Sequence, residues 1–180
     1  SLEVCIFLKR QFKLVKKYFN PKVLTAVEIL ELTTYKFMRE LKAGFYIKST
    51  AELNGSFFED TTILIVEHNE EGSIGFVTNK FFGKSLHELI EFNHVKPFPL
   101  MDGGPVDRDH LFVIHKRPDI IDGGKEIPNG FYFGGNMEQV VDAINTRATD
   151  KKEIQIFIGY CGWDAEELEA ELEEGSWIMV

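Results

Sequence analysis

Short runs of β-branched and aromatic residues recur along the chain from Gly44 to its end, separated by polar, glycine and proline residues. Runs of this length and composition predict β-strands. We expect strands at residues 45–49, 61–67, 73–78, 111–114, 130–133, 154–160 and 176–180. The polar segment His68–Gly72 between the second and third runs is short enough for a turn, so these two strands are predicted to form a β-hairpin.

Three segments begin with a polar residue that is followed three positions later by Glu or Gln. In this capping-box pattern the two residues satisfy each other's unpaired backbone N–H groups at the start of a helix. The pairs are Ser85 with Glu88, Asn136 with Gln139, and Asp164 with Glu167. We therefore predict helices over 85–92, over 136–145 and after Asp164, and we interpret the Pro- and Gly-rich segment 93–110 as a long functional loop.

The segment "GYCGWDAEELEAELEEGSW", residues 159–177, places the chain's only two tryptophans on either side of the third predicted helix. Trp163 can pack on Leu168 as a hydrophobic staple, and Gly175 supplies the left-handed residue that ends a helix. The many acidic residues between them predict a solvent-exposed helix face. We interpret the segment as the structure that closes the fold, without a role in chemistry.

Residues 1–41 are predicted to be helical and basic, with Asn20 and Pro21 as a helix start. Residues 1–42 hold nine basic and four acidic residues, a net charge of +5, which leaves −14 for the remainder of a chain whose net charge is −9. We expect this arm to dock on its own domain or on a second copy, so a homodimer through the N-terminal helices is a candidate assembly. A basic amphipathic helix on a membrane surface is the alternative. Met38 is a candidate natural start, because the globular pattern begins just after it.

The overall composition is that of a soluble α+β domain. Apolar residues make up 44% of the chain, and no apolar run approaches the roughly 20 residues of a membrane-spanning helix. Cys5 and Cys161 are far apart and show no Cys-x-x-Cys spacing, which argues against a disulfide scaffold and indicates a cytoplasmic protein. The acidic domain repels phosphate backbones, so we do not expect direct nucleic-acid binding except through the basic arm.

No residue pattern typical of a catalytic site is present. There is no Gly-x-Ser-x-Gly motif, the five histidines have no carboxylate at a spacing that would complete a metal site, and Cys161 lies among aromatic residues that would raise the pKa of its thiol. We therefore expect no catalytic residue, no metal and no cofactor. The Gly103–Gly104 turn leaves one alternative open, because glycine amides can form a nest for a phosphate. The simpler interpretation is a backbone turn that only glycine fits.

Four motifs together resemble the AlgH/YqgE-like family of small bacterial proteins: "EHNEEGSIGFVTNK" (67–80), "GGPVD" (103–107), "LFVIH" (111–115) and the segment 159–177. The resemblance runs from about residue 44 to 180 and implies an α+β fold, with a mixed, split β-sheet that has a barrel-like portion flanked by helices. It divides the chain into a helical extension, 1–41, and an AlgH-like domain, 42–180. The chain departs from the family pattern at Thr50, Asn54 and Glu167, where the family commonly has Pro, Asp and Gln.

The resemblance implies no established enzymatic activity, although the family carries a transcriptional-regulator label. We expect a cytoplasmic binding or regulatory module that engages an unidentified protein partner without catalysis. The candidate surface consists of polar residues at strand ends and loops: Glu67, His68, Asn79, Gly103, Gly104, Pro105 and Asp107. The alternatives are a hydrolase or other enzyme with a phosphate or nucleotide-like ligand at the Gly-Gly-Pro-Val loop, and a transcription-linked regulator that acts indirectly or through the basic arm.

Overall fold

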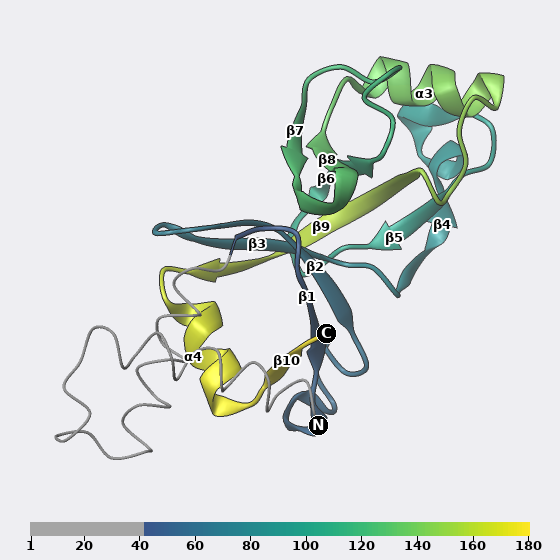
Figure 1. Ribbon diagram of the computed structural model, residues 1–180. Helices are drawn as coiled ribbons and strands as arrows, with labels where there is room; N and C mark the ends of the chain where they lie inside the picture. The colour runs from purple at the N-terminus through teal and green to yellow at the C-terminus, as the bar shows by residue number, and fades with distance from the viewer. Residues whose placement is uncertain (1–41) are drawn as a thin grey trace, which may run out of the picture. The chain divides into compact units, whose positions relative to one another are not determined.

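The computed structural model describes residues 42–180, which form a curled, mixed β-sheet with two α-helices (Figure 1). The strands follow the order β10-β1-β2-β3-β9-β6-β8-β7, and all of these neighbours are antiparallel. β5 adds to β9 in parallel, and β4 pairs with β5. The predicted arm 1–41, its helices and its dimer contact lie outside the described residues.

The strands are β1 Tyr46–Ser49, β2 Thr62–Asn69, β3 Gly72–Val77, β4 Phe81–Ser85, β5 Pro99–Asp102, β6 Val106–His115, β7 Gly124–Ile127, β8 Phe131–Gly134, β9 Ile154–Asp164 and β10 Trp177–Met179. The α-helices are α3 Met137–Thr146 and α4 Glu167–Glu174, and 3₁₀ turns occur at Ala51–Leu53, Leu86–Glu88, Ile90–Phe92 and Pro128–Gly130. Among the described residues, no helix has the length and apolar character needed to cross a membrane.

β9 joins the two halves of the sheet. Its residue Ile156 pairs with Leu100 of β5 on one edge and with Val113 of β6 on the other. Further along, Cys161 pairs with Gly75 of β3, so the second half of β9 belongs to the β1–β2–β3–β10 side. The mixed, split sheet expected from the family resemblance is confirmed by this arrangement.

β2 is buried on both faces. Ile63 and Ile65 contribute to the buried cluster under α4, whereas Leu64 and Val66 belong to a cluster on the opposite face. A strand covered on both sides has apolar residues in succession, without the alternation of a half-exposed strand. This explains the uninterrupted apolar run in its sequence, and the predicted hairpin with β3 is confirmed.

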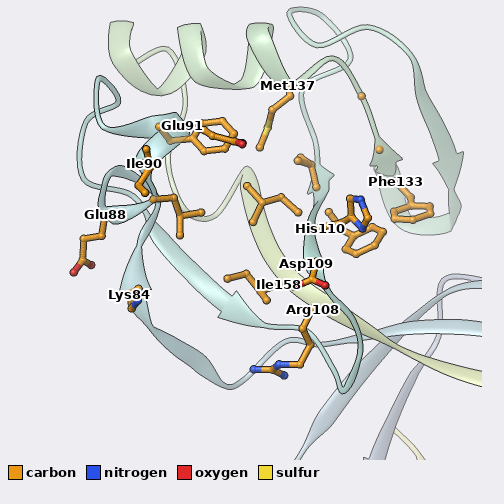
Figure 2. Close-up of a pocket in the computed structure, with 17 residues that line it drawn as sticks. Lys84, Glu88, Ile90, Glu91, Arg108, Asp109, His110, Phe133, Met137 and Ile158 are labelled. Atoms are coloured by element: carbon orange, nitrogen blue, oxygen red, sulfur yellow. The ribbon is translucent and has the colours of Figure 1, made fainter.

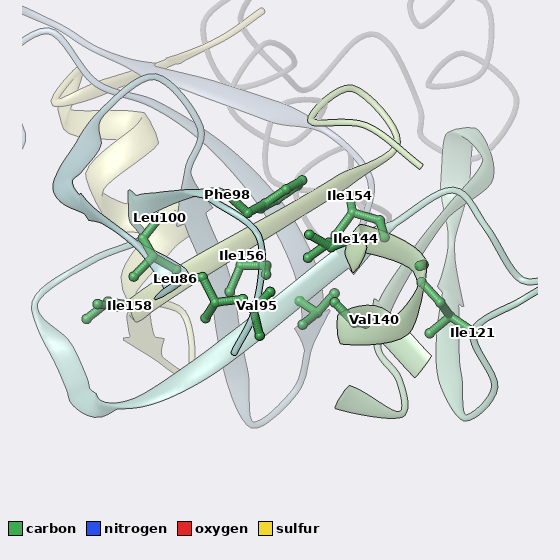
Figure 3. Close-up of a cluster of buried hydrophobic side chains, with 12 residues drawn as sticks. Leu86, Val95, Phe98, Leu100, Ile121, Val140, Ile144, Ile154, Ile156 and Ile158 are labelled. Carbon is green, nitrogen blue, oxygen red and sulfur yellow. The ribbon is translucent and has the colours of Figure 1, made fainter. Parts of the chain in front are cut away.

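A third buried cluster lies between α3 and the strands β5, β9 and β6 (Figure 3). α3 contributes Val140, Ala143 and Ile144, whose spacing of three and four residues places them on one helix face. Its cap is Asn136, as predicted, whose side-chain oxygen accepts hydrogen bonds from the Glu138 and Gln139 amides. Gln139 does not complete the capping box, because its amide group instead binds Asp122 through two hydrogen bonds.

The helix predicted over 85–92 is wrong. Two 3₁₀ turns stand there, separated by Leu89 in an extended conformation. The Ser85 amide donates to the Glu88 carboxylate at 2.6 Å, as the pattern predicted, but Leu86 N and the Ser85 hydroxyl both donate to the Phe98 carbonyl. Eight residues are too few for a stable helix on local propensity alone, and these bonds to the neighbouring chain decide the conformation.

The predicted loop 93–110 is also shorter than expected. It contains β5 and the first half of β6, and the strand predicted at 111–114 therefore begins at Val106. β4 and β7 were not predicted either, because their sequences, with Gly83 and Gly124, are too rich in Gly and Lys to show a strand pattern. Pro99 is tolerated because it is the first residue of its strand.

The closing segment confirms the interpretation of its tryptophans and corrects that of its acidic residues. Trp163, Trp177 and Leu168 belong to one buried cluster, and Gly175 ends α4 at φ 85°. The helix starts later than predicted, at Glu167, although the Glu167 carboxylate does accept the Asp164 amide hydrogen at 2.8 Å.

One acid of α4 is not part of a merely solvated face. Both indole N–H groups donate to the same carboxylate oxygen, Glu171 Oε2, from Trp163 at 2.7 Å and from Trp177 at 2.8 Å. The two rings meet edge to face with centroids 6.1 Å apart. Glu171 thus ties the end of β9 and the start of β10 to α4.

Candidate functional site

The Gly103–Gly104 segment carries the chain across β9, from the edge that pairs with β5 to the edge that pairs with β6. The crossing is so close that a Cβ on Gly104 would lie 2.2 Å from the Tyr160 carbonyl, and one on Gly103 would lie 2.3 Å from the Gly159 carbonyl oxygen. The Gly103 amide donates to Ile158 O at 2.9 Å, so it belongs to the sheet. These contacts support the structural interpretation of the motif over the phosphate nest.

Arg108 holds the two sides of this crossing together. Its guanidinium donates to both carboxylate oxygens of Asp102, at 2.7 and 3.3 Å, and to the Gly104 carbonyl oxygen at 2.9 Å. The hydrogen bond with Asp102 raises the pKa of Arg108. The charge next to the Gly-Gly-Pro-Val loop is therefore already paired within the chain.

The remaining predicted surface residues are separated by the fold. Asn79 bridges backbone groups at the start of β2, accepting from Thr62 N at 2.9 Å and donating to Asp60 O at 2.7 Å. Glu67 and His68 lie five and six residues further along β2, which is roughly 17–20 Å along an extended strand. The structure does not bring these two groups together.

Glu67 and His68 each have partners within the domain. Lys125 Nζ of β7 lies 3.3 Å from Glu67 Oε1. The nearly buried His68 ring forms a 2.8 Å hydrogen bond with the Ser73 hydroxyl and approaches Glu169 of α4 at 3.7 Å. Both side chains therefore connect structural elements.

A groove with a volume of about 810 Å³ lies elsewhere, and we take it as the candidate site (Figure 2). The 3₁₀ turns of 86–92, β6, the end of β8 and the start of α3 form its walls. Its apolar surface includes Leu89, Phe92, Leu111, Val113, Met137 and Ile158. Most of these side chains also belong to, or pack against, the core cluster beneath α3, so the groove is an open end of that core.

Charged side chains of both signs surround the mouth of the groove (Figure 2): Lys84, Glu88, Glu91, Arg108, Asp109 and His110. Ile90, also at the mouth, is 90% exposed. Asp107, from the predicted surface, reaches this rim through a 2.6 Å hydrogen bond to His110 Nδ1, which raises the pKa of His110.

None of the described residues that line the groove is Ser, Thr, Cys or Tyr. Among these lining residues the imidazole of His110 therefore has no hydroxyl or thiol group beside it. Nor do the described residues contain a cluster of side chains able to hold a metal ion. The lining combines an apolar interior with a polar rim, as ligand pockets and protein interfaces do.

Cys161 is expected to be chemically inert. It is 1% exposed, and burial raises its pKa to about 12. Because only the thiolate is nucleophilic, we predict that iodoacetamide at pH 8 labels Cys161 at least about a hundredfold more slowly in the native protein than in urea. Mass spectrometry of the peptide that contains Cys161 measures this, and equal rates in both states would contradict the burial.

A family model described as AlgH-like matches residues 45–180. The chain belongs to the AlgH-like family. It is 45% identical over 138 residues to the UPF0301 protein CT0663 of Chlorobaculum tepidum, covering 76% of this chain and 73% of that protein. It is 37% identical over 137 residues to the UPF0301 protein BF2109 of Bacteroides fragilis, covering 76% and 69%. The family resemblance read from the motifs is thereby confirmed.

Solved structures share this fold. The solution structure of the AlgH protein from Pseudomonas aeruginosa matches with a TM-score of 0.60 and 26% identity, over 76% of this chain and 75% of that chain. The crystal structure of DIP2367 from Corynebacterium diphtheriae matches in fold with a TM-score of 0.63, at 20% identity, over 78% and 76% of the two chains. The AlgH-like match begins after the basic arm.

The groove of this AlgH-like domain was missed by the sequence interpretation. The helix predicted over 85–92 includes Leu89, Ile90 and Phe92. A usable signal was present, since Leu89 and Ile90 are adjacent apolar residues and cannot both face the same way on so short a segment. Neither Lys84 nor Arg108 lies in a segment that was predicted as a strand. Only the pairing of the strands brings both to the rim of the groove.

Proposed function

We propose that this AlgH-like protein is a non-catalytic binding module whose groove receives an apolar segment of a partner protein. The observation that carries the proposal is Ile90, which stands 90% exposed at the mouth of a groove with an apolar interior. Large apolar side chains are common on surfaces singly, but next to an open apolar groove they mark an interaction site.

A protein segment suits the groove better than a small molecule does. Ile90 stands at the open side, where it would enclose little of a small ligand but would be covered by a partner that extends beyond the groove. The rim carries charges of both signs, among them Lys84, Glu88 and Glu91, so its net charge is small and gives little selection for a strongly charged ligand. Binding dominated by apolar contact should persist at high salt, since screening acts on charges.

We propose that the protein acts in the bacterial cytoplasm. The free thiol of Cys161 is compatible with this reducing compartment. Because the domain is strongly acidic, we propose that any effect on transcription is indirect and passes through the bound protein. No specific observation favours an enzyme at the Gly-Gly-Pro-Val loop, whose backbone the strand crossing uses.

Replacing Ile90 by Glu tests the proposal. The substitution should leave stability within about 0.5 kcal/mol, because the side chain is almost fully exposed, and should lower affinity for the partner at least about tenfold by placing a charge at the apolar contact. Affinity purification from the source bacterium identifies the candidate partner, and titration of the purified pair in 0.1 and 1 M salt measures the affinity.

The matched control is Ile178→Glu, since Ile178 is an apolar residue 50% exposed on β10, away from the residues that line the groove. The proposal requires that Ile178→Glu binds like the wild type and that Ile90→Glu does not. Equal loss in both variants, no loss in either, or binding that disappears in 1 M salt would refute it. A small molecule that copurifies with the wild type and is lost only from Ile90→Glu would replace the protein segment as the occupant.

A further inference from the structure

A buried histidine, His115, lies directly behind one wall of the groove. It is the last residue of β6 and is 1% exposed. Its Nδ1 accepts the Arg117 backbone N–H at 3.1 Å, so the proton of the neutral ring resides on Nε2. Nε2 has no hydrogen-bond partner among the described residues. A buried donor without an acceptor costs about 1–3 kcal/mol, which makes this position unusual for a residue of purely structural importance.

Two glycines create the space for the imidazole. A Cβ on Gly124 would lie 2.8 Å from His115 Nε2, and one on Gly135 would lie 3.2 Å from it. Tyr132 stacks on the ring with centroids 5.5 Å apart. Gly124 also pairs with Gly134, so the ring is covered by the open end of the β7–β8 hairpin.

That hairpin end is part of the groove. Phe133, Gly134 and Gly135 line it, and Gly135 contacts both the groove and the space around His115 Nε2. A change in the protonation of His115 therefore acts on the groove through the backbone of Gly135, which adjoins both.

Protonation conflicts with this environment. A second proton would occupy Nδ1, which now accepts the Arg117 amide, and the charge would be buried without a hydrogen-bond acceptor on Nε2. Burial accordingly lowers the pKa of His115, and the nearby Asp119 carboxylate opposes this shift only in part.

Most charged groups on the elements packed against the ring pair with other side chains. Arg117 pairs with Asp119 and Glu153, Gln139 binds Asp122, and Lys125 of β7 pairs with Glu67. Glu126 lies opposite Tyr132 on the exposed edge strand β7. None of these contacts supplies an acceptor to Nε2.

We propose that His115 is a pH-sensitive latch: its protonation opens the β7–β8 hairpin over residues 124–135 and thereby reshapes the groove wall. The consequence for binding rests on the proposed function, whereas the opening itself does not. Because the folded-state pKa lies below the ordinary value of 6.5, protons bind preferentially to the opened hairpin. Above about pH 6.5 the equilibrium constant for hairpin opening should not depend on pH. Below that pH it should increase by up to about tenfold per pH unit, until the folded-state pKa is reached.

An NMR titration of the full chain tests the latch directly. We expect the His115 ring resonances to titrate below pH 6.5, with amide shifts of Gly124, Gly134 and Gly135 following the same midpoint. Hydrogen exchange of the hairpin amides, corrected for the intrinsic effect of pH, should accelerate over the same range. In His115→Gln this acceleration should vanish, while His94→Gln, which changes an exposed histidine, should retain it.

The titration uses the wild-type protein, so the test holds even if His115→Gln does not fold. A His115 pKa at or above 6.5 would overturn the latch. So would hydrogen exchange of the hairpin amides that shows the same pH dependence as exchange in the other strands of the sheet. Neither result depends on any partner. The proposed function can therefore fail with Ile90→Glu while the latch stands, and the reverse also holds.

Discussion

Gly104→Ala is expected to destabilise the domain by at least about 3 kcal/mol, a large fraction of the roughly 5–15 kcal/mol that stabilises a typical domain. The added Cβ would lie 2.2 Å from the Tyr160 carbonyl carbon and oxygen, and 2.6 Å from Cys161 N. These are backbone atoms of the central strand, which cannot move away without breaking pairs with β3 or β6. Urea unfolding followed by circular dichroism measures the loss.

Gly162→Ala is the matched control on the same strand. Its Cβ would meet only the Tyr160 ring, at 3.3 Å, where a side chain can shift. The control should change the free energy of unfolding by less than about 1 kcal/mol. If the two variants unfold at the same urea concentration, the close crossing at Gly104 is not a structural requirement, and the Gly-Gly-Pro-Val loop becomes a candidate ligand site again.

Glu171→Ala is expected to cost about 3 kcal/mol, because two indole N–H groups that share one carboxylate oxygen lose their acceptor together. Glu171→Gln keeps a carbonyl oxygen at that position and should cost less, about 1–2 kcal/mol, since hydrogen bonds to a charged acceptor are the stronger ones. The chain has no other tryptophan, so tryptophan fluorescence during denaturant unfolding comes only from the two indoles that Glu171 binds, and its midpoint measures the change in stability.

Glu173→Ala provides the comparison on the same helix. Glu173 is exposed and lies near the negative end of the α4 dipole, so its removal should be neutral or slightly stabilising, within about 0.5 kcal/mol. Similar unfolding midpoints for Glu171→Ala and Glu173→Ala would show that the acids of α4 act only as a solvated face.

Local pattern was sufficient for elements whose stability depends on nearby residues. A hairpin was predicted correctly from the apolar run around Ile63–Val66 and the polar turn before Ser73. The helix that follows Asn136 was predicted correctly from its cap. The paired glycines at 103–104 indicated a backbone position that no side chain fits, and that too is confirmed. In each case a short-range constraint, either the side-chain period or the steric limit at glycine, leaves few alternatives.

Long-range pairing decided the rest. The Ser85–Glu88 pattern could begin a helix, but the Ser85 hydroxyl and the Leu86 N–H donate to the Phe98 carbonyl instead. In the resulting conformation Ile90 lies exposed beside the groove. Glu171 looks like any other acid of its helix in the sequence, and only the folded chain brings the indoles of the two flanking tryptophans to its carboxylate. His115 looks like an ordinary strand residue until glycines from another hairpin cover it. Spacing along a chain specifies which way a side chain faces, but the partner it finds depends on which surfaces the sheet brings together.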